Sequence, residues 1–141
     1  MFKKIFNRQK KESLDNKSVL IAALLIHAAR IDENYTDVEK EIIKKALVEL
    51  NNISSDQAEN SIKFAEKKEE ESNQIVEFTR EIKKYSMEFR LKIIEIIWKI
   101  VYSDGASDDY ESNLIRRICG LLYISGKDNG IIKTKVQNLS K

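Results

Sequence analysis

The stretch "MEFRLKIIEIIWKIVYSD", residues 87–104, is apolar around most of a helical circumference. Its regular polar positions follow the spacing i, i+4, i+7, i+11 and form one narrow stripe: Glu88, Lys92, Glu95 and Lys99. A helix of this kind is stable in water only when other helices surround it. The stretch therefore predicts a central buried helix, in which Trp98 is a core residue rather than a ligand platform.

The rest of the chain is also predicted to be helical, because proline is absent and only 4 glycines occur. Capping signals mark several helix starts, namely Thr36/Glu39, Ser54/Gln57, Asp108/Glu111 and Ser125/Asp128. Together with the apolar periodicity, they predict an all-α protein. The expected helices span residues 15–32, 36–51, 55–71, 74–85, 87–104, 108–123 and 127–138, with a further short one at 2–9.

Composition indicates one compact domain. The chain has 141 residues, of which 42% are apolar and 34% charged, as in ordinary soluble proteins. The 25 basic and 23 acidic residues nearly cancel, so no nucleic-acid partner is expected. The single cysteine, Cys119, excludes an internal disulfide and a cysteine-based zinc site, and it is predicted to be a buried small hydrophobe. These features favour a cytoplasmic location.

The N-terminal residues 1–12 differ in character from the helical domain predicted over 13–141. Within "MFKKIFNRQKK", residues 1–11, five cations occur without an acid, and Met1, Phe2, Ile5 and Phe6 share one side of a helix. Two interpretations stay open. The segment is either a weak contact for an anionic membrane, placing the protein peripherally at the inner membrane face, or a basic tail whose phenylalanines dock on the protein's own core. The longest apolar run, residues 19–26, is too short to cross a bilayer and is expected in a buried helix.

An internal repeat organises the fold. Shifted by 72 positions, "ALLIHAARIDENYTDVEKEIIKKALVEL" (23–50) aligns with "EIIWKIVYSDGASDDYESNLIRRICGLL" (95–122). The sequence therefore predicts a single-domain bundle of about seven helices built on two repeated helical hairpins, with Asp32 and Asp104 at equivalent helix ends. A two-fold arrangement of the hairpins would bring both acidic turns to one side.

The repeated aspartates need an explanation, because a negative charge at a helix C-terminus is unfavourable by about 0.3–1 kcal/mol. One explanation is local: each aspartate makes an Asx turn, while Glu39 and Glu111 complete capping boxes. The other is a divalent cation shared by Asp32 or Asp104 with Glu39 or Glu111. An EF-hand is excluded by the spacing, but an all-oxygen set suits Ca²⁺, Mg²⁺ or Mn²⁺.

Two other polar features carry no predicted chemistry. His27, the only histidine, does not share the helical face of Asp32, so it is predicted to be a surface or half-buried side chain rather than a metal ligand. The run "EKKEEES", residues 66–72, is predicted to be a solvated helix face and helix end.

The second turn resembles a known family. A helix ending in "YSDG", then five residues, Glu111 and "IRRICGLLYIS", preceded by the weaker copy "ARIDENYTDVE", is similar to the TerB family of bacterial tellurite-resistance and stress-response proteins. The resemblance covers residues 15–138 and extends to the related domain of membrane-anchored DnaJ-like cochaperones. It implies one all-helical domain and acidic turn residues that bind divalent metal, here Asp32, Glu39, Asp104 and Glu111. Glu33 stands where the family motif has glycine, so the first copy departs from the pattern.

Two functional hypotheses follow. The first is a non-catalytic interaction or scaffold module, with a protein partner, in a bacterial stress-response or membrane-associated system. The second is a metal-dependent hydrolase that uses paired carboxylates to activate water. The acids have no histidine or lysine base beside them in the sequence, which favours the first hypothesis.

Overall fold

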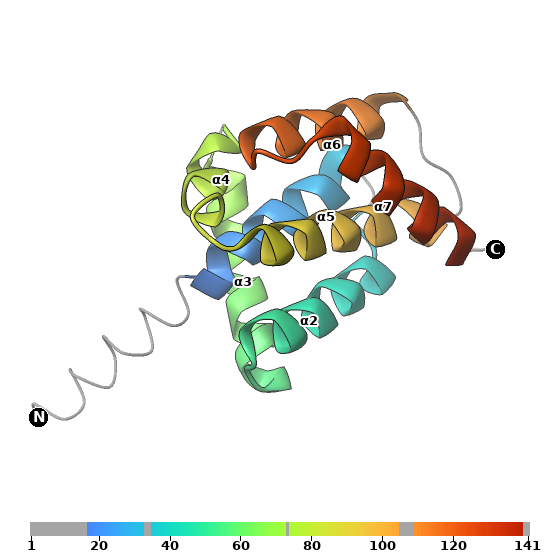
Figure 1. Cartoon of the computed structure of the whole chain (residues 1–141). Helices are drawn as coiled ribbons and strands as arrows, with labels where there is room; N and C mark the ends of the chain where they lie inside the picture. The colour runs from blue at the N-terminus through green and yellow to red at the C-terminus, as the bar shows by residue number, and fades with distance from the viewer. Residues whose placement is uncertain (1–16, 33–34, 73, 105–108, 140–141) are drawn as a thin grey trace, which may run out of the picture.

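The computed structural model describes residues 17–32, 35–72, 74–104 and 109–139, and at residues 32, 104 and 109–111 it describes the backbone alone. After a helix of residues 17–29, the elements are η1 (Arg30–Asp32), α2 (Asp37–Asn51), α3 (Ser55–Glu71), α4 (Val76–Ile82), α5 (Met87–Val101), η2 (Tyr102–Asp104), α6 (Asp109–Leu121) and α7 (Gly126–Leu139). Figure 1 shows them packed as a helical bundle, which confirms the predicted all-α class. The helix expected at residues 2–9 lies outside the described residues. None of the described helices combines the length and apolar character needed to cross a bilayer.

The helix of residues 17–29 lies in the middle of the bundle (Figure 1, blue). Every residue from Ile21 to Ile26 is 0% exposed. Helix α5 packs in the same core, and Ile93, Ile94 and Ile97 are likewise 0% exposed. The polar stripe of α5 remains at the surface or half-buried, as the sequence predicts. The bundle therefore has two central helices, which confirms the predicted burial of residues 87–104 and of the apolar run 19–26.

Trp98 and Cys119 are core residues, as predicted. Trp98 is almost fully buried, and its indole Nε1–H donates to Asn129 Oδ1 at 2.9 Å, which ties α5 to α7. Its ring also stacks on Tyr102, with ring centroids 5.7 Å apart. Cys119 is a buried free thiol on α6. Both side chains are therefore packing elements.

Capping bonds start the helices where the sequence places them. In α2 and α3, the hydroxyls of Thr36 and Ser54 accept from the N–H groups of Glu39 and Gln57, at 3.1 Å in both cases, and the reciprocal bonds are present. At the start of α7, Ser125 Oγ accepts from the N–H of Asp128 at 3.1 Å. Such bonds satisfy N–H groups that the first helical turn leaves unpaired. The capping box predicted at Asp108/Glu111 lies outside the described side chains.

In each copy of the repeat, the first helix ends in the same local structure. Asp32 is the last residue of the 3₁₀ turn η1, and Asp104 is the last residue of η2, so the predicted helix-end positions are confirmed. In Figure 1, the helix of residues 17–29 and α5 both run from the left to the right of the view, towards η1 and η2. Packing is reciprocal, because α2 of the first copy contacts α5 of the second while α6 contacts η1. This pattern agrees with an approximate two-fold relation between the copies.

Helix α6 ends in a Schellman motif whose left-handed position is Tyr123 rather than glycine. The N–H of Ile124 donates to Cys119 O at 2.8 Å and that of Tyr123 donates to Gly120 O at 3.3 Å. This closure requires a positive φ, and Tyr123 has φ 59°. The guanidinium of Arg90 also donates to Leu122 O and, at 3.1 Å, to Tyr85 O. The helix end is thereby fixed against the start of α5.

Tyr123→Gly should raise the free energy of unfolding by about 1 kcal/mol, because the left-handed conformation is unfavourable for a residue with a Cβ and open to glycine. Tyr123 is 67% exposed, so little burial is lost with the ring. Urea unfolding measures the change. Tyr123→Ala is the control: it keeps the Cβ and should give no increase. A glycine variant that is less stable than the alanine variant would contradict the inference that the backbone of Tyr123 is strained.

Candidate functional site

The four predicted metal ligands are described to different extents. Asp32 and Asp104 end their 3₁₀ turns, and Glu111 lies in the first turn of α6. For these three residues only the backbone is described. The structure therefore establishes their places in the chain fold and leaves the ligand role of their side chains as a prediction.

Glu39, the fourth, is described in full and is buried. Its Oε1 accepts from the N–H of Thr36 at 3.1 Å and from the Thr36 hydroxyl at 3.0 Å. This carboxylate completes the capping box of α2 and stays in a network of hydrogen bonds. A carboxylate already engaged in this way is a poorer candidate for metal binding than one that faces solvent. The fit to a divalent cation is thus weakest in the first copy, where the motif also lacks its glycine.

Among the described side chains, no group of three or more histidine, cysteine, aspartate or glutamate residues is arranged to hold a metal ion. The acids of the second turn, Asp104 and Glu111, lie outside that search. An oxygen-only donor set on those residues suits Ca²⁺, Mg²⁺ or Mn²⁺. The metal hypothesis therefore rests on the second copy.

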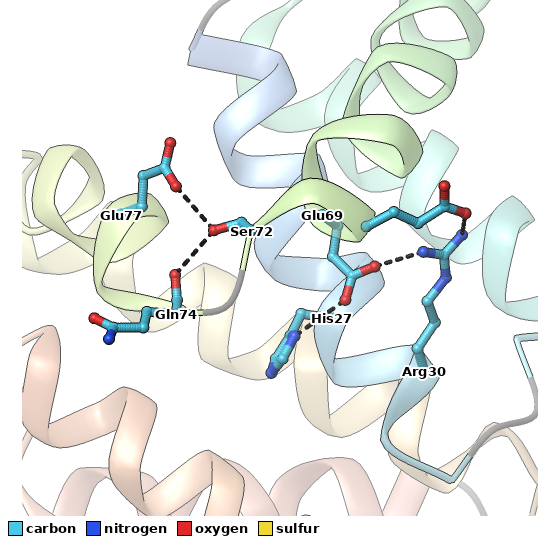
Figure 2. A network of polar contacts seen from close by, with 7 residues as sticks. His27, Arg30, Glu69, Ser72, Gln74 and Glu77 are labelled. Atoms are coloured by element: carbon cyan, nitrogen blue, oxygen red, sulfur yellow. Dashed lines mark hydrogen bonds and ion pairs between the residues drawn. The ribbon is translucent and has the colours of Figure 1, made fainter.

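The described polar network with the most connections centres on Glu69, in the last turn of α3 (Figure 2). Its Oε1 lies 3.2 Å from His27 Nδ1, and its Oε2 accepts from Arg30 Nη1. Arg30 also reaches Glu70, with Nη2 3.5 Å from Oε1. Because an ionised carboxylate only accepts, His27 must carry a proton on Nδ1. The network fastens the end of the central helix and η1 to α3.

Tyr35 lies beside this network, with its ring close to two cations. Its ring centroid is 5.2 Å from the guanidinium carbon of Arg30 and 4.9 Å from Lys40 Nζ. Lys40 in turn pairs with Glu66 of α3 at 3.3 Å. Burial, and then the negative charge of Glu66, raise the pKa of the Tyr35 hydroxyl above its usual range, while Arg30 lowers it. The phenol is therefore neutral at physiological pH. Through Arg30, Lys40 and Glu66, the cluster holds Tyr35 against α3.

These contacts correct one prediction about residues 66–72. Lys67, Glu70 and Glu71 are exposed, as a solvated face requires, but Glu69 is half-buried and central to the network. Ser72 then links α3 to α4, because its hydroxyl donates to Glu77 Oε2 at 2.8 Å and lies 3.3 Å from Gln74 O (Figure 2). His27 is half-buried, as predicted. The i, i+3 spacing of His27 and Arg30 on an otherwise apolar helix was the available signal that an acid lies opposite.

Both carboxylate oxygens of Glu69 are used by cationic or N–H partners, so this group acts as an ion-pair acceptor. A general base needs an oxygen directed at the proton it removes. The arrangement is suited to joining helices.

Comparison with known protein families identifies one family that matches this chain. A family model described as "Tellurite resistance protein TerB" matches residues 18–134. Searches among curated proteins and among solved structures give no match. The match spans most of the chain and includes both acidic turns and the Glu69 network.

Glu69→Gln should lower the free energy of unfolding by about 2 kcal/mol, because a half-buried charged acceptor with two partners is removed. Its side chain is 12% exposed. The matched control is Glu70→Gln, which alters the next residue and a contact with the same arginine, but the side chain there is 66% exposed. That change should cost no more than about 0.5 kcal/mol. Equal losses for the two variants in chemical unfolding would contradict the role of Glu69.

Cys119 should be unreactive in the folded protein, because burial raises the pKa of its thiol to about 12. The thiolate is the reactive form, so raising the pH through the ordinary cysteine range leaves Cys119 protonated until well above that range. We expect negligible reaction with a disulfide reagent at mildly alkaline pH and complete reaction after unfolding in guanidinium. Stoichiometric labelling of the native protein within minutes would contradict this burial.

Proposed function

We propose that the chain, which belongs to the TerB family, is a non-catalytic interaction module of a bacterial stress-response or membrane-associated system. The observation that supports this best is the use of its described acids. Glu69 joins two helices, and Glu39 caps α2. The hydrolase hypothesis needs paired carboxylates directed at a bound water. Glu39, the one predicted acid whose side chain is described, is instead engaged in the cap of α2.

The proposal includes a divalent cation at the second acidic turn. Asp104 ends η2 and Glu111 lies in the first turn of α6, so the two residues flank the connection between the helices of one hairpin. A bound cation would offset the unfavourable charge of Asp104 at a helix end. It would also stabilise the folded state, because the unfolded chain does not preform the site.

A protein partner and a peripheral membrane contact complete the proposal. The membrane contact is assigned to residues 1–11, whose cations would be attracted to anionic lipid at the cytoplasmic face. Those residues lie outside the described part of the chain. Their sequence supports the contact through five cations on one side and the apolar group Phe2, Ile5 and Phe6 on the other.

The cation hypothesis is tested by thermal melting of the protein and of Asp104→Asn, with and without millimolar Ca²⁺, Mg²⁺ or Mn²⁺. We expect a rise in melting temperature for the unmodified protein, because binding to the folded state alone contributes about 2.7 kcal/mol at a hundredfold excess over the dissociation constant. The variant should lose this response. Without metal it should be as stable as the parent or slightly more so, since asparagine keeps an Asx turn and removes the charge.

Asp37→Asn is the matched control, because Asp37 is an exposed acid in the first turn of α2 and is not assigned to the site. It should keep the full metal response. A parent protein whose melting temperature ignores all three cations would contradict the proposed site, and the acidic turns would then be explained by capping alone.

A further inference from the structure

We propose that the end of the bundle carrying Tyr123 is a contact surface for an anionic lipid membrane, with Tyr123 and Lys83 as its central residues. The inference rests on the peripheral membrane contact proposed above and adds a second contact, on the folded domain. Neither the family match nor the proposed cation site assigns a role to Tyr123 or Lys83.

The first observation is the conformation of Tyr123. This residue holds φ 59° at a position where glycine is favoured, and the ring is 67% exposed, so burial does not offset the strain. Strained backbone conformations that surrounding contacts hold in place are typical of functional sites. Here Arg90 fixes the preceding carbonyl, Leu122 O, and thereby holds Tyr123 in place.

The second observation is the chemistry around the ring. Lys83 Nζ lies 5.9 Å from the Tyr123 ring centroid. Lys84 follows it and pairs with Glu81 at 3.2 Å. An exposed tyrosine, with an apolar body and a polar tip, beside a lysine is a combination found where proteins meet lipid headgroups.

The third observation is where the described chain begins. Lys17, the first described residue, lies with its Nζ 4.5 Å from the Tyr85 ring centroid and 4.8 Å from that of Phe89. Arg90 connects Tyr85 O to Leu122 O, next to Tyr123. In Figure 1 the central helix begins at the left of the view, where α4 and the end of α6 also lie. The described chain therefore begins at the same end of the bundle as Tyr123.

These placements favour a membrane over an acidic protein as the occupant. A lipid surface is extended and carries negative charge everywhere, so it can contact the N-terminal cations and the Lys83–Tyr123 pair at once. Two linked weak contacts reinforce each other, because the second forms at high effective concentration. One short apolar segment alone gives only marginal membrane binding. A second contact on the domain would make the association stable and fix the orientation of the bundle.

The test is sedimentation of the full chain with vesicles of phosphatidylcholine alone or mixed one to one with phosphatidylglycerol. We expect binding to the mixed vesicles that falls with salt. Lys83→Gln should weaken it about fivefold, the equivalent of about 1 kcal/mol for one surface cation. Tyr123→Gly should weaken binding although it is expected to stabilise the fold, so unfolding cannot explain the loss. Phe64→Ala is the matched control, because Phe64 on α3 is 64% exposed and lies outside this surface.

A double variant, Phe2→Ser with Phe6→Ser, separates the two contacts. Weaker binding in this variant, in Tyr123→Gly and in Lys83→Gln, with Phe64→Ala unchanged, supports the inference. If the double variant loses binding while Tyr123→Gly binds like the parent, the domain contact is wrong and the N-terminal contact stands. If the parent protein does not sediment with mixed vesicles at low salt, both are wrong. An equal loss in Phe64→Ala would also overturn the assignment to this surface.

Discussion

The fold depends on covering one helix on all sides. Residues 21–26 of the central helix have no exposed surface, so its apolar side chains contribute to stability only while other helices enclose them. The described contacts reach it from several directions: Asn51 of α2 donates to Ser18, Glu69 of α3 binds Arg30, and Tyr85 and Phe89 lie against Lys17. Helix α5 shares the core and brings the second hairpin with it. The repeat thereby supplies two similar helices to one apolar interior.

Polar residues of the central helix are confined to its two ends, and this separates the chemistry of the bundle into two regions. At the beginning, Lys17 and Ser18 contact α5 and α2. At the far end, His27 and Arg30 hold the acidic group of α3, and η1 follows. Asp32 and Asp104 end η1 and η2 beyond that second end, whereas Tyr123 lies near the first. A cation site and a lipid contact would therefore occupy opposite ends of the bundle and would not compete for the same residues.

Helix boundaries were predictable because local signals set them. Capping hydroxyls, the lack of proline and the period of apolar residues act within a few positions, and the helices start within two residues of their predicted beginnings wherever the start is described. The matching ends of η1 and η2 were predictable for a related reason, since two similar segments fold locally in the same way. The role of Glu69 was not predictable. It depends on the last turn of α3 meeting His27 and Arg30, whose positions lie 42 and 39 residues away along the chain.

By itself the sequence determined the all-helical class, the repeat, the caps, the burial of Trp98 and Cys119 and the resemblance to the TerB family, because composition, periodicity and short motifs are encoded within one helix or one turn. Only the tertiary structure decided that Glu69 joins α3 to His27 and Arg30, that the helix of residues 17–29 and α5 pack in one core, and that Arg90 of α5 fixes the carbonyl before Tyr123. Each of these outcomes depends on contacts between segments distant in sequence. The free energy of such contacts depends on how the helices pack, and no single stretch of the chain specifies that packing.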